Sequence, residues 1–316
     1  MVKLKSKNVS YFPIIAILSI VLMMSGSLYS QSQAGRTSAD FLSIGVGAKA
    51  AGMGGAFTAM TEGADAAYWN PAGLTSVESG EVLLSHFNWY QDLSLEYGAF
   101  AKKINEKTTI ASSITYLNYG TIKRYGLNGE ALTNDISVYD WAGAVSFGYI
   151  VSDNISIGVT AKYVNQTIDD LSGSALAADF GFKYISPKFA IAGFLGNFGS
   201  KMKFDTQEEK LPATARLGLS FYPFSQNFVT AIEAEKKVDG NTVVRHGVEY
   251  NFNQQYYLRS GYNYFVDEVD RSFGANLSFG AGVEFNSASL DYAFTLSDSF
   301  TNESLHRFSL LFKFGN

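Results

Sequence analysis

Short segments in which apolar residues alternate with small or polar ones recur along most of this chain, and this period of two constrains the fold more than any other feature. In the clearest segment, residues 273–285, every odd-numbered position is apolar and every even-numbered one is Gly, Asn, Ser or Glu. Because successive side chains of a β-strand point to opposite faces, such a segment predicts a strand with one apolar face. The pattern returns at residues 155–163, 176–184, 215–221 and 290–297.

After the first segment of the chain, no apolar run approaches the roughly 20 residues that a membrane-spanning helix needs. Yet 47% of the residues are hydrophobic, 15% are aromatic and only 17% are charged. This combination favours a β-barrel in lipid, where closure leaves no strand edge unpaired. On composition alone, a soluble β-sandwich is the alternative.

The pattern predicts about 14 strands, and an even number is expected of a bacterial single-chain barrel. The predicted starts are Gly80, Leu93, Lys107, Tyr139, Asn154, Ser174, Lys188, Ala213, Asn227, Thr242, Tyr256, Ser272, Ala288 and Leu305. The fold class expected is therefore all-β transmembrane, an antiparallel outer-membrane barrel over residues 80–316.

Short and long connections largely alternate between these strands. Tight turns are predicted at Asn105-Glu106, Ser152-Asp153, Ser186-Pro187, Pro223 to Gln226, Asn253-Gln254 and Asn286-Ser287. Longer or more polar loops are predicted at Gly120 to Val138, Asp169 to Gly173, Gly199 to Pro212 and Ser297 to Ser304. Barrels with short periplasmic turns and longer outer loops show this parity, whereas a soluble sandwich has no reason to.

The N-terminus has the layout of a secretory signal peptide over residues 1–30. Lys3, Lys5 and Lys7 precede an apolar stretch, 11–24, and small and polar residues follow up to an expected cleavage after Ser30. An uncleaved anchor is the alternative, but the apolar stretch is short for one. The chain has no Cys, so a lipid-acylated N-terminus and disulfides are excluded. We expect an exported protein located in the cell outer membrane, in contact with lipid and lipopolysaccharide.

Several charged residues fall on the inferred inward faces of the strands. These are Lys162, Asp179, Lys183, Arg216 and Glu284. Placing them inside avoids a cost of a few kcal/mol in the middle of the lipid. They either line a polar conduit or form an internal network of ion pairs that braces the wall.

Little in the sequence points to catalysis, and we expect no enzymatic activity and no cofactor. Gly45-x-Gly47-x-x-Ala50 is a degenerate dinucleotide fingerprint without a βαβ unit around it. His86, His246 and His306 are far apart, so a metal site is not predicted. The net charge of −5 argues against nucleic-acid binding. Asp267, Glu268, Asp270 and Asp298 lie in inferred outer loops that either bind cations or are simply solvated.

Residues 31–79 differ from the rest in being rich in Ala and Gly, with little strict alternation. Two stretches stand out, residues 41–56 (FLSIGVGAKAAGMGGA) and 68–73 (YWNPAG). In these the chain resembles the PorV/PorQ-like family, itself similar to FadL-type barrels. The motif residues are Gly52, Gly54, Gly55, Trp69, Asn70, Pro71, Ala72 and Gly73. The resemblance implies that residues 31–79 pack in or under the lumen as a small plug. From the residues themselves we expect a short strand or helix, then a helix around Gly63 to Tyr68 that stops before Pro71.

The resemblance also implies two alternative functions. PorV/PorQ-like proteins are associated with type IX secretion in Bacteroidota-type bacteria, through contacts with secretion components or exported protein cargo. FadL-type barrels are passive channels for hydrophobic small molecules, which would bind in the lumen. A strand-breaking Gly or Pro in one wall beside an apolar pocket would favour the channel, and a large groove without such a pocket would favour protein cargo.

Overall fold

The computed structural model describes residues 37–89, 93–126, 128–132, 135–204, 207–238, 240–266, 276–296 and 304–315. The predicted signal peptide lies outside the described residues and stays a prediction. The described residues also leave out Phe273 and Ala275 of the 273–285 segment, and the acidic loop residues Asp267, Glu268, Asp270 and Asp298.

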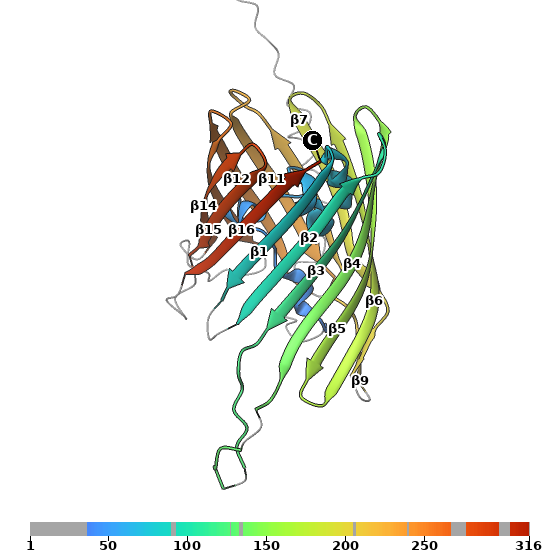
Figure 1. Ribbon diagram of the computed structural model, residues 1–316, viewed down its shortest axis with the longest axis vertical. Coiled ribbons are helices and arrows are strands. Elements are labelled where there is room, and N and C mark those ends of the chain that lie inside the picture. The colour runs from blue at the N-terminus through green and yellow to red at the C-terminus, as the bar shows by residue number, and fades with distance from the viewer. Residues whose placement is uncertain are drawn as a thin grey trace, which may run out of the picture.

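The described strands form a closed antiparallel barrel of 14 strands (Figure 1). Its strands are β1 (Gly80–Asn88), β2 (Ser94–Lys103), β3 (Thr108–Asn118), β4 (Val138–Ser152), β5 (Ile155–Ile168), β6 (Leu171–Ile185), β7 (Phe189–Gly199), β10 (Thr214–Phe221), β11 (Phe228–Lys237), β12 (Thr242–Phe252), β13 (Tyr256–Phe265), β14 (Leu277–Phe285), β15 (Ala288–Thr295) and β16 (Leu305–Phe314). Each pairs with its neighbours in the chain, and β1 pairs with β16 to close the ring. The short β8 (Met202–Phe204) and β9 (Gln207–Glu209) form a separate hairpin within the connection from β7 to β10.

The predicted fold class and strand number are confirmed, and all but two strands begin within one residue of the predicted start. The exceptions are β6 and β14. The predicted loop from Asp169 to Gly173 was wrong, because only Asp169 and Asp170 connect β5 to β6 and Ser172 already pairs with Thr167. Asp169 adopts a positive φ of 56°, which closes this two-residue turn. Polar residues had indicated a loop there, but strands are free to carry polar side chains.

The barrel has two unlike ends. The predicted tight turns lie at the end that carries Gly80 and Phe314, which we call the turn end. The opposite end, the loop end, carries the hairpin of residues 119–137 and the β8–β9 hairpin (Figure 1). The wall is tallest at β4, β5 and β6, which have 15, 14 and 15 residues.

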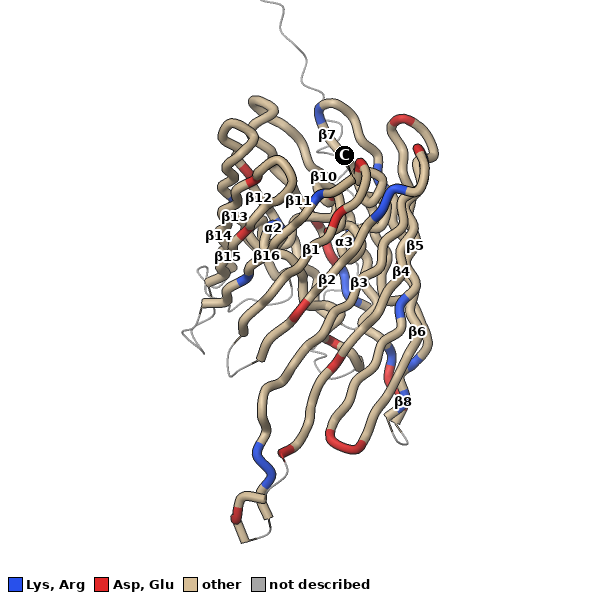
Figure 2. The backbone as a smooth tube through the Cα atoms, viewed as in Figure 1, with Lys and Arg blue, Asp and Glu red and all other residues tan. Residues whose placement is uncertain are grey.

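Alternation decides which face each side chain takes. On β6, Leu176 and Phe180 are 64% and 53% exposed on the outside, whereas Asp179 between them is fully buried. Most of the strand length carries neither acidic nor basic residues (Figure 2). No helix in the described part of the chain is both long and apolar enough to cross a membrane.

Residues 37–79 fold inside the barrel as a plug made of short helical segments (Figure 1). These are η1 (Asp40–Ser43), α2 (Ala48–Gly52), η2 (Gly63–Asp65), α3 (Ala66–Trp69) and η3 (Pro71–Ser76). The structure therefore contains the helix that the sequence predicted before Pro71, in two pieces. The plug starts at the loop end, where the Ser38 amide donates to the Lys210 carbonyl at 3.0 Å, and leads into β1 at the turn end.

The hydrophobic core lies between the plug and the wall. Phe41, Phe57, Trp69 and Leu74 of the plug are at most 5% exposed, and they belong to the same buried cluster as Leu83, Phe87 and Leu95 of β1 and β2. The wall approaches the plug closely at glycine positions. A Cβ at Gly158 would overlap the backbone of Pro71 and Ala72, so a larger residue there would displace η3.

Candidate functional site

The motif residues of the plug position it against the wall. Asn70 is fully buried; its Oδ1 accepts from the Ala72 amide at 3.1 Å, and its Nδ2 donates to the Phe182 carbonyl of β6 at 3.2 Å. The Trp69 indole donates to the Val46 carbonyl at 3.0 Å and so joins two parts of the plug. Pro71 is the first residue of η3, where its missing amide hydrogen is not needed.

The four motif glycines and Ala72 permit close packing. Gly54 and Gly55 have positive φ values of 66° and 78°, which L side chains rarely adopt. A Cβ on Gly52 would lie 3.0 Å from the Cα of Gly280 in β14, and one on Gly73 would lie 2.6 Å from the Thr61 carbonyl. Ala72 is fully buried.

Wall side chains hold the plug backbone. Glu233 of β11 accepts from the Phe57 and Thr58 amides at 3.1 and 2.8 Å. Glu81 of β1 accepts from the Ala64 amide at 2.8 Å. The Ser309 hydroxyl of β16 accepts from the Ala48 amide, also at 2.8 Å. These contacts satisfy backbone donors of the plug that its short helices and the turn between them leave without a partner.

All five charged residues predicted to face inward do so, and all are paired. Lys162 lies 2.7 Å from Asp179, and Glu284 lies 2.6 Å from Lys313. Arg216 lies 3.9 Å from Glu235. The Lys183 ammonium donates to the Thr61 carbonyl of the plug at 2.7 Å. This arrangement supports the bracing interpretation, and three of the five, Lys162, Arg216 and Glu284, also line cavities.

Several other charged residues that face the lumen were not identified from the sequence. Arg245 lies 3.3 Å from Glu233 and 3.1 Å from Glu235, and Arg259 contacts both Glu249 and Asp291. The signal was present in the sequence, because each of these residues has the parity of the inward face of its own strand.

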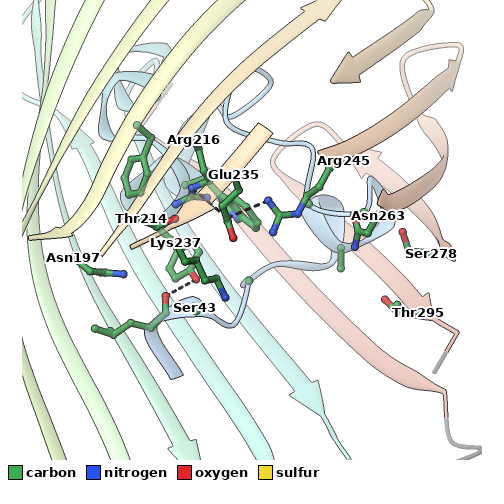
Figure 3. A pocket seen from close by; sticks show the side chains of 18 of the residues that line it. Ser43, Asn197, Thr214, Arg216, Glu235, Lys237, Arg245, Asn263, Ser278 and Thr295 are labelled. Carbon is green, nitrogen blue, oxygen red and sulfur yellow. Dashed lines mark hydrogen bonds and ion pairs between the residues drawn. The ribbon is translucent and has the colours of Figure 1, made fainter. Parts of the chain in front are cut away.

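A cavity of about 200 Å³ lies on the loop-end side of the plug, and we call it the loop-end cavity (Figure 3). Figure 3 shows Arg216 and Arg245 on either side of Glu235. The polar lining of the loop-end cavity comes from Ser43, Lys162, Asn197, Thr214, Arg216, Glu235, Lys237, Arg245, Asn263, Ser278, Thr295 and Arg307. Its aromatic lining comes from Tyr68, Trp69 and Phe194. The cavity is thus rich in cations and aromatic rings.

A second cavity of about 430 Å³, the turn-end cavity, lies on the other side of the plug and has the opposite charge. Seven carboxylates line it, against three cations, Lys49, Arg259 and Lys313. The carboxylates are Glu62, Asp65, Glu78, Glu81, Glu249, Glu284 and Asp291. Burial raises the pKa of Asp65 to about 7, against the opposing effect of Lys49. The two cavities share no lining residue, so the plug separates a basic chamber from an acidic one.

The features weighed for catalysis do not come together. His86 contacts Glu96, His246 contacts Thr230 and His306 contacts Tyr292, each exposed on the side of the wall away from the lumen. The described residues contain no group of three or more His, Asp or Glu placed to hold a metal ion. Gly45 and Gly47 lie in the plug between η1 and α2, without the strand that a dinucleotide site needs.

The fold and its plug define the class of the protein: an outer-membrane β-barrel with an internal hatch. A family model described as type IX secretion system protein PorV matches residues 29–243, and the chain belongs to this family. No curated protein matches the sequence. Neither the family nor the fold is that of an enzyme class.

Solved structures of similar fold are FadL-type barrels. The chain is similar to CymD, a monoaromatic hydrocarbon channel (TM-score 0.61, 14% identity, 86% of this chain and 98% of that one). It is similar to the Pseudomonas putida toluene transporter TodX (TM-score 0.58, 13% identity, 90% of this chain and 98% of that one). It is also similar to a Pseudomonas aeruginosa FadL homologue (TM-score 0.58, 12% identity, 86% of this chain and 99% of that one). At these identities the likeness establishes the fold.

Proposed function

We propose that this barrel acts in type IX protein secretion by binding partner proteins at its loop end, not by conducting solutes through its lumen. The observation that carries the proposal is an arm, residues 119–137, that projects beyond the barrel at the loop end (Figure 1). The loop end faces the cell exterior in this proposal, and residues 1–30 are removed as a signal peptide.

The arm is ordered by its own contacts. Bridges join Ile122 to Ile136 and Tyr125 to Ala131, and Lys123 lies 3.2 Å from Asp135. The Arg124 guanidinium lies 2.5 Å from Asp169 in the β5–β6 turn, which attaches the arm to the tallest part of the wall. A shaped arm loses less conformational entropy on binding than a flexible loop does.

The arm carries apolar side chains that have no lipid to contact so far beyond the barrel. Tyr125 is 63% exposed, Ile122 40% and Leu132 39%. Exposed apolar groups on a projecting polar segment mark protein–protein contact sites, and Tyr is enriched at such interfaces. The plug adds support, because it separates the two cavities and so argues against an open conduit through the lumen.

The test is crosslinking from the arm in native outer membranes. A photoreactive residue at Tyr125 should capture secretion components or exported cargo. The matched control is Phe224, an 86% exposed aromatic residue in the turn between β10 and β11 at the opposite end. Recovery from Tyr125 of only lipid, or of the same neighbours as from Phe224, would contradict the proposal.

A passive channel for hydrophobic small molecules is the second candidate, and a feature of the wall favours it. The pairing of β6 with β7 shifts register around Asp179, where Asn197 of β7 takes a positive φ of 60°. Asn197 lines the loop-end cavity together with Trp69 and Phe194. The structural neighbours named as hydrocarbon channels and a toluene transporter support this candidate. Against it, the bulge is filled, since Lys162 donates to Asn197 at 2.9 Å and Asp179 accepts from the Asn197 amide at 2.8 Å.

Deletion of residues 121–135 separates the two candidates. Loss of secreted cargo with unchanged toluene uptake supports the secretion role. Unchanged secretion together with toluene uptake that depends on the protein supports the channel.

A further inference from the structure

We propose that the loop-end cavity is a binding site for a small organic carboxylate whose hydrocarbon part packs against the aromatic lining. This site lies in the lumen and not on the arm, so the proposal does not depend on the secretion role.

The cavity carries an excess of positive charge. Five cationic side chains line it, Lys162, Arg216, Lys237, Arg245 and Arg307, against one lining carboxylate, Glu235. Two carboxylates behind the lining also take part, Asp179 at 2.7 Å from Lys162 and Glu233 at 3.3 Å from Arg245. Among the described residues two positive charges stay uncompensated, and a partly enclosed chamber with such an excess attracts an anion.

Arg307 of β16 is the strongest single indication. In the described part of the chain, no carboxylate lies within the 4.0 Å of an ion pair with its guanidinium, and its buried Nε has no hydrogen-bond partner. The guanidinium stacks 3.8 Å from the ring centroid of Phe87, which fixes its plane. A guanidinium that is held in place and whose Nε has no acceptor among the described residues suits a carboxylate, which it can bind with two parallel hydrogen bonds.

Arg216 of β10 provides a second guanidinium in the same cavity. It lies over the rings of Phe194 and Trp69, 4.1 and 5.0 Å from their centroids. Its Nε is 3.9 Å from Glu235, too far for a hydrogen bond, and has no other partner. Glu235 is shared with Arg245, which takes it at 3.1 Å, so Arg216 retains donor capacity toward the cavity.

The rest of the lining selects the hydrocarbon part of the ligand. Tyr68, Trp69 and Phe194 present rings to the cavity, and the Tyr68 hydroxyl is occupied by the Leu42 and Ile44 carbonyls at 2.9 and 2.8 Å. At about 200 Å³ the cavity is smaller than a typical drug-sized site and suits one ring with a short acid chain. Thr295 and Leu305, at the loop ends of β15 and β16, belong to the lining, so the ligand enters from the loop end.

The experiment uses the full mature protein in detergent micelles, with phenylacetate as the probe. Binding is followed by calorimetry and by the change in tryptophan fluorescence, to which Trp69 in the cavity lining contributes. Phenylacetamide, which has the same shape without the charge, and inorganic sulfate, which has charge without a ring, are the comparison ligands. We expect saturable binding of phenylacetate at least about 10-fold tighter than that of either comparison ligand. Phenylacetamide cannot form the stronger, charge-assisted hydrogen bonds, and sulfate has no ring to bury against the aromatic lining.

Two variants locate the site. Arg307→Gln should weaken phenylacetate binding by about 10- to 100-fold. Lys313→Gln should not weaken it, although Lys313 is an inward cation on the same strand, because it lines the turn-end cavity. Equal affinity for phenylacetate and phenylacetamide in the unmodified protein would overturn the proposal whether or not the variants fold. Equal losses in the two variants would also overturn it.

Discussion

Asn70 of the plug and Phe182 of β6 are joined by a hydrogen bond of 3.2 Å from the Asn70 side-chain amide to the Phe182 carbonyl. The other atom of the same amide group accepts from the Ala72 backbone and caps η3. One fully buried side chain therefore both ends the extended segment before η3 and attaches the plug to the barrel.

Replacing Asn70 by Ala should lower the free energy of unfolding by about 1–3 kcal/mol, because it removes a cap and leaves buried backbone groups without partners. Urea unfolding of the protein in micelles measures this. Asn88→Ala is the control, since Asn88 is exposed at the end of β1. Equal stability of the two variants would show that the Asn70 contacts contribute nothing.

Lys162→Met should destabilise the barrel by about 3–5 kcal/mol, because it leaves the fully buried Asp179 without its ion-pair partner. Lys123→Met, which breaks the exposed pair with Asp135 on the arm, should change stability by at most about 1 kcal/mol. Adding Asp179→Asn to Lys162→Met should recover part of the loss. No recovery would mean that packing, not the unpaired charge, causes the effect.

Asp65 should make the barrel less stable as the pH rises. Its pKa is about 7 in the folded state, because it is buried, and about 3.9 in an unfolded chain. The protonated form is therefore favoured by folding. Its contribution is full below pH 4, declines between pH 4 and 7, and is absent above pH 7, a difference of about 4 kcal/mol at most.

Asp65→Asn, which stays neutral, should remove this part of the pH dependence. Unfolding in urea at pH 5 and pH 8 provides the measurement for both proteins. A variant that loses as much stability as the unmodified protein between these pH values would contradict the assignment to Asp65.

The orientation of the barrel can be tested with single cysteines, because the natural chain has none. Asp40 is exposed at the loop end and Glu78 is exposed at the turn end. In intact cells a maleimide that does not cross the outer membrane should label Asp40→Cys. It should label Glu78→Cys only after the outer membrane is permeabilised. The reverse pattern would place the loop end in the periplasm.

Some of the charged residues in the lumen could be predicted from the sequence. Lys162, Asp179, Lys183, Arg216 and Glu284 were placed inside by parity alone, and the structure agrees. The same argument applies to Glu233 and Arg245, which face one another in the register of β11 and β12. The loop predicted at Asp169 to Gly173 failed for a related reason, because polarity there reflects the face of a strand and not the end of one.

By itself the sequence determined the number of strands, the starts of all but β6 and β14, and the face that alternating side chains take. These properties depend on the pleat of a single strand and on local turn residues, so they are written in neighbouring positions. Only the tertiary structure decided which charges meet. Glu233 binds the Phe57 amide across 176 residues of chain, and none of the described carboxylates lies within ion-pair distance of Arg307 in the cavity. Those relationships depend on how the barrel closes and on how the plug folds within it, and no local pattern contains that information.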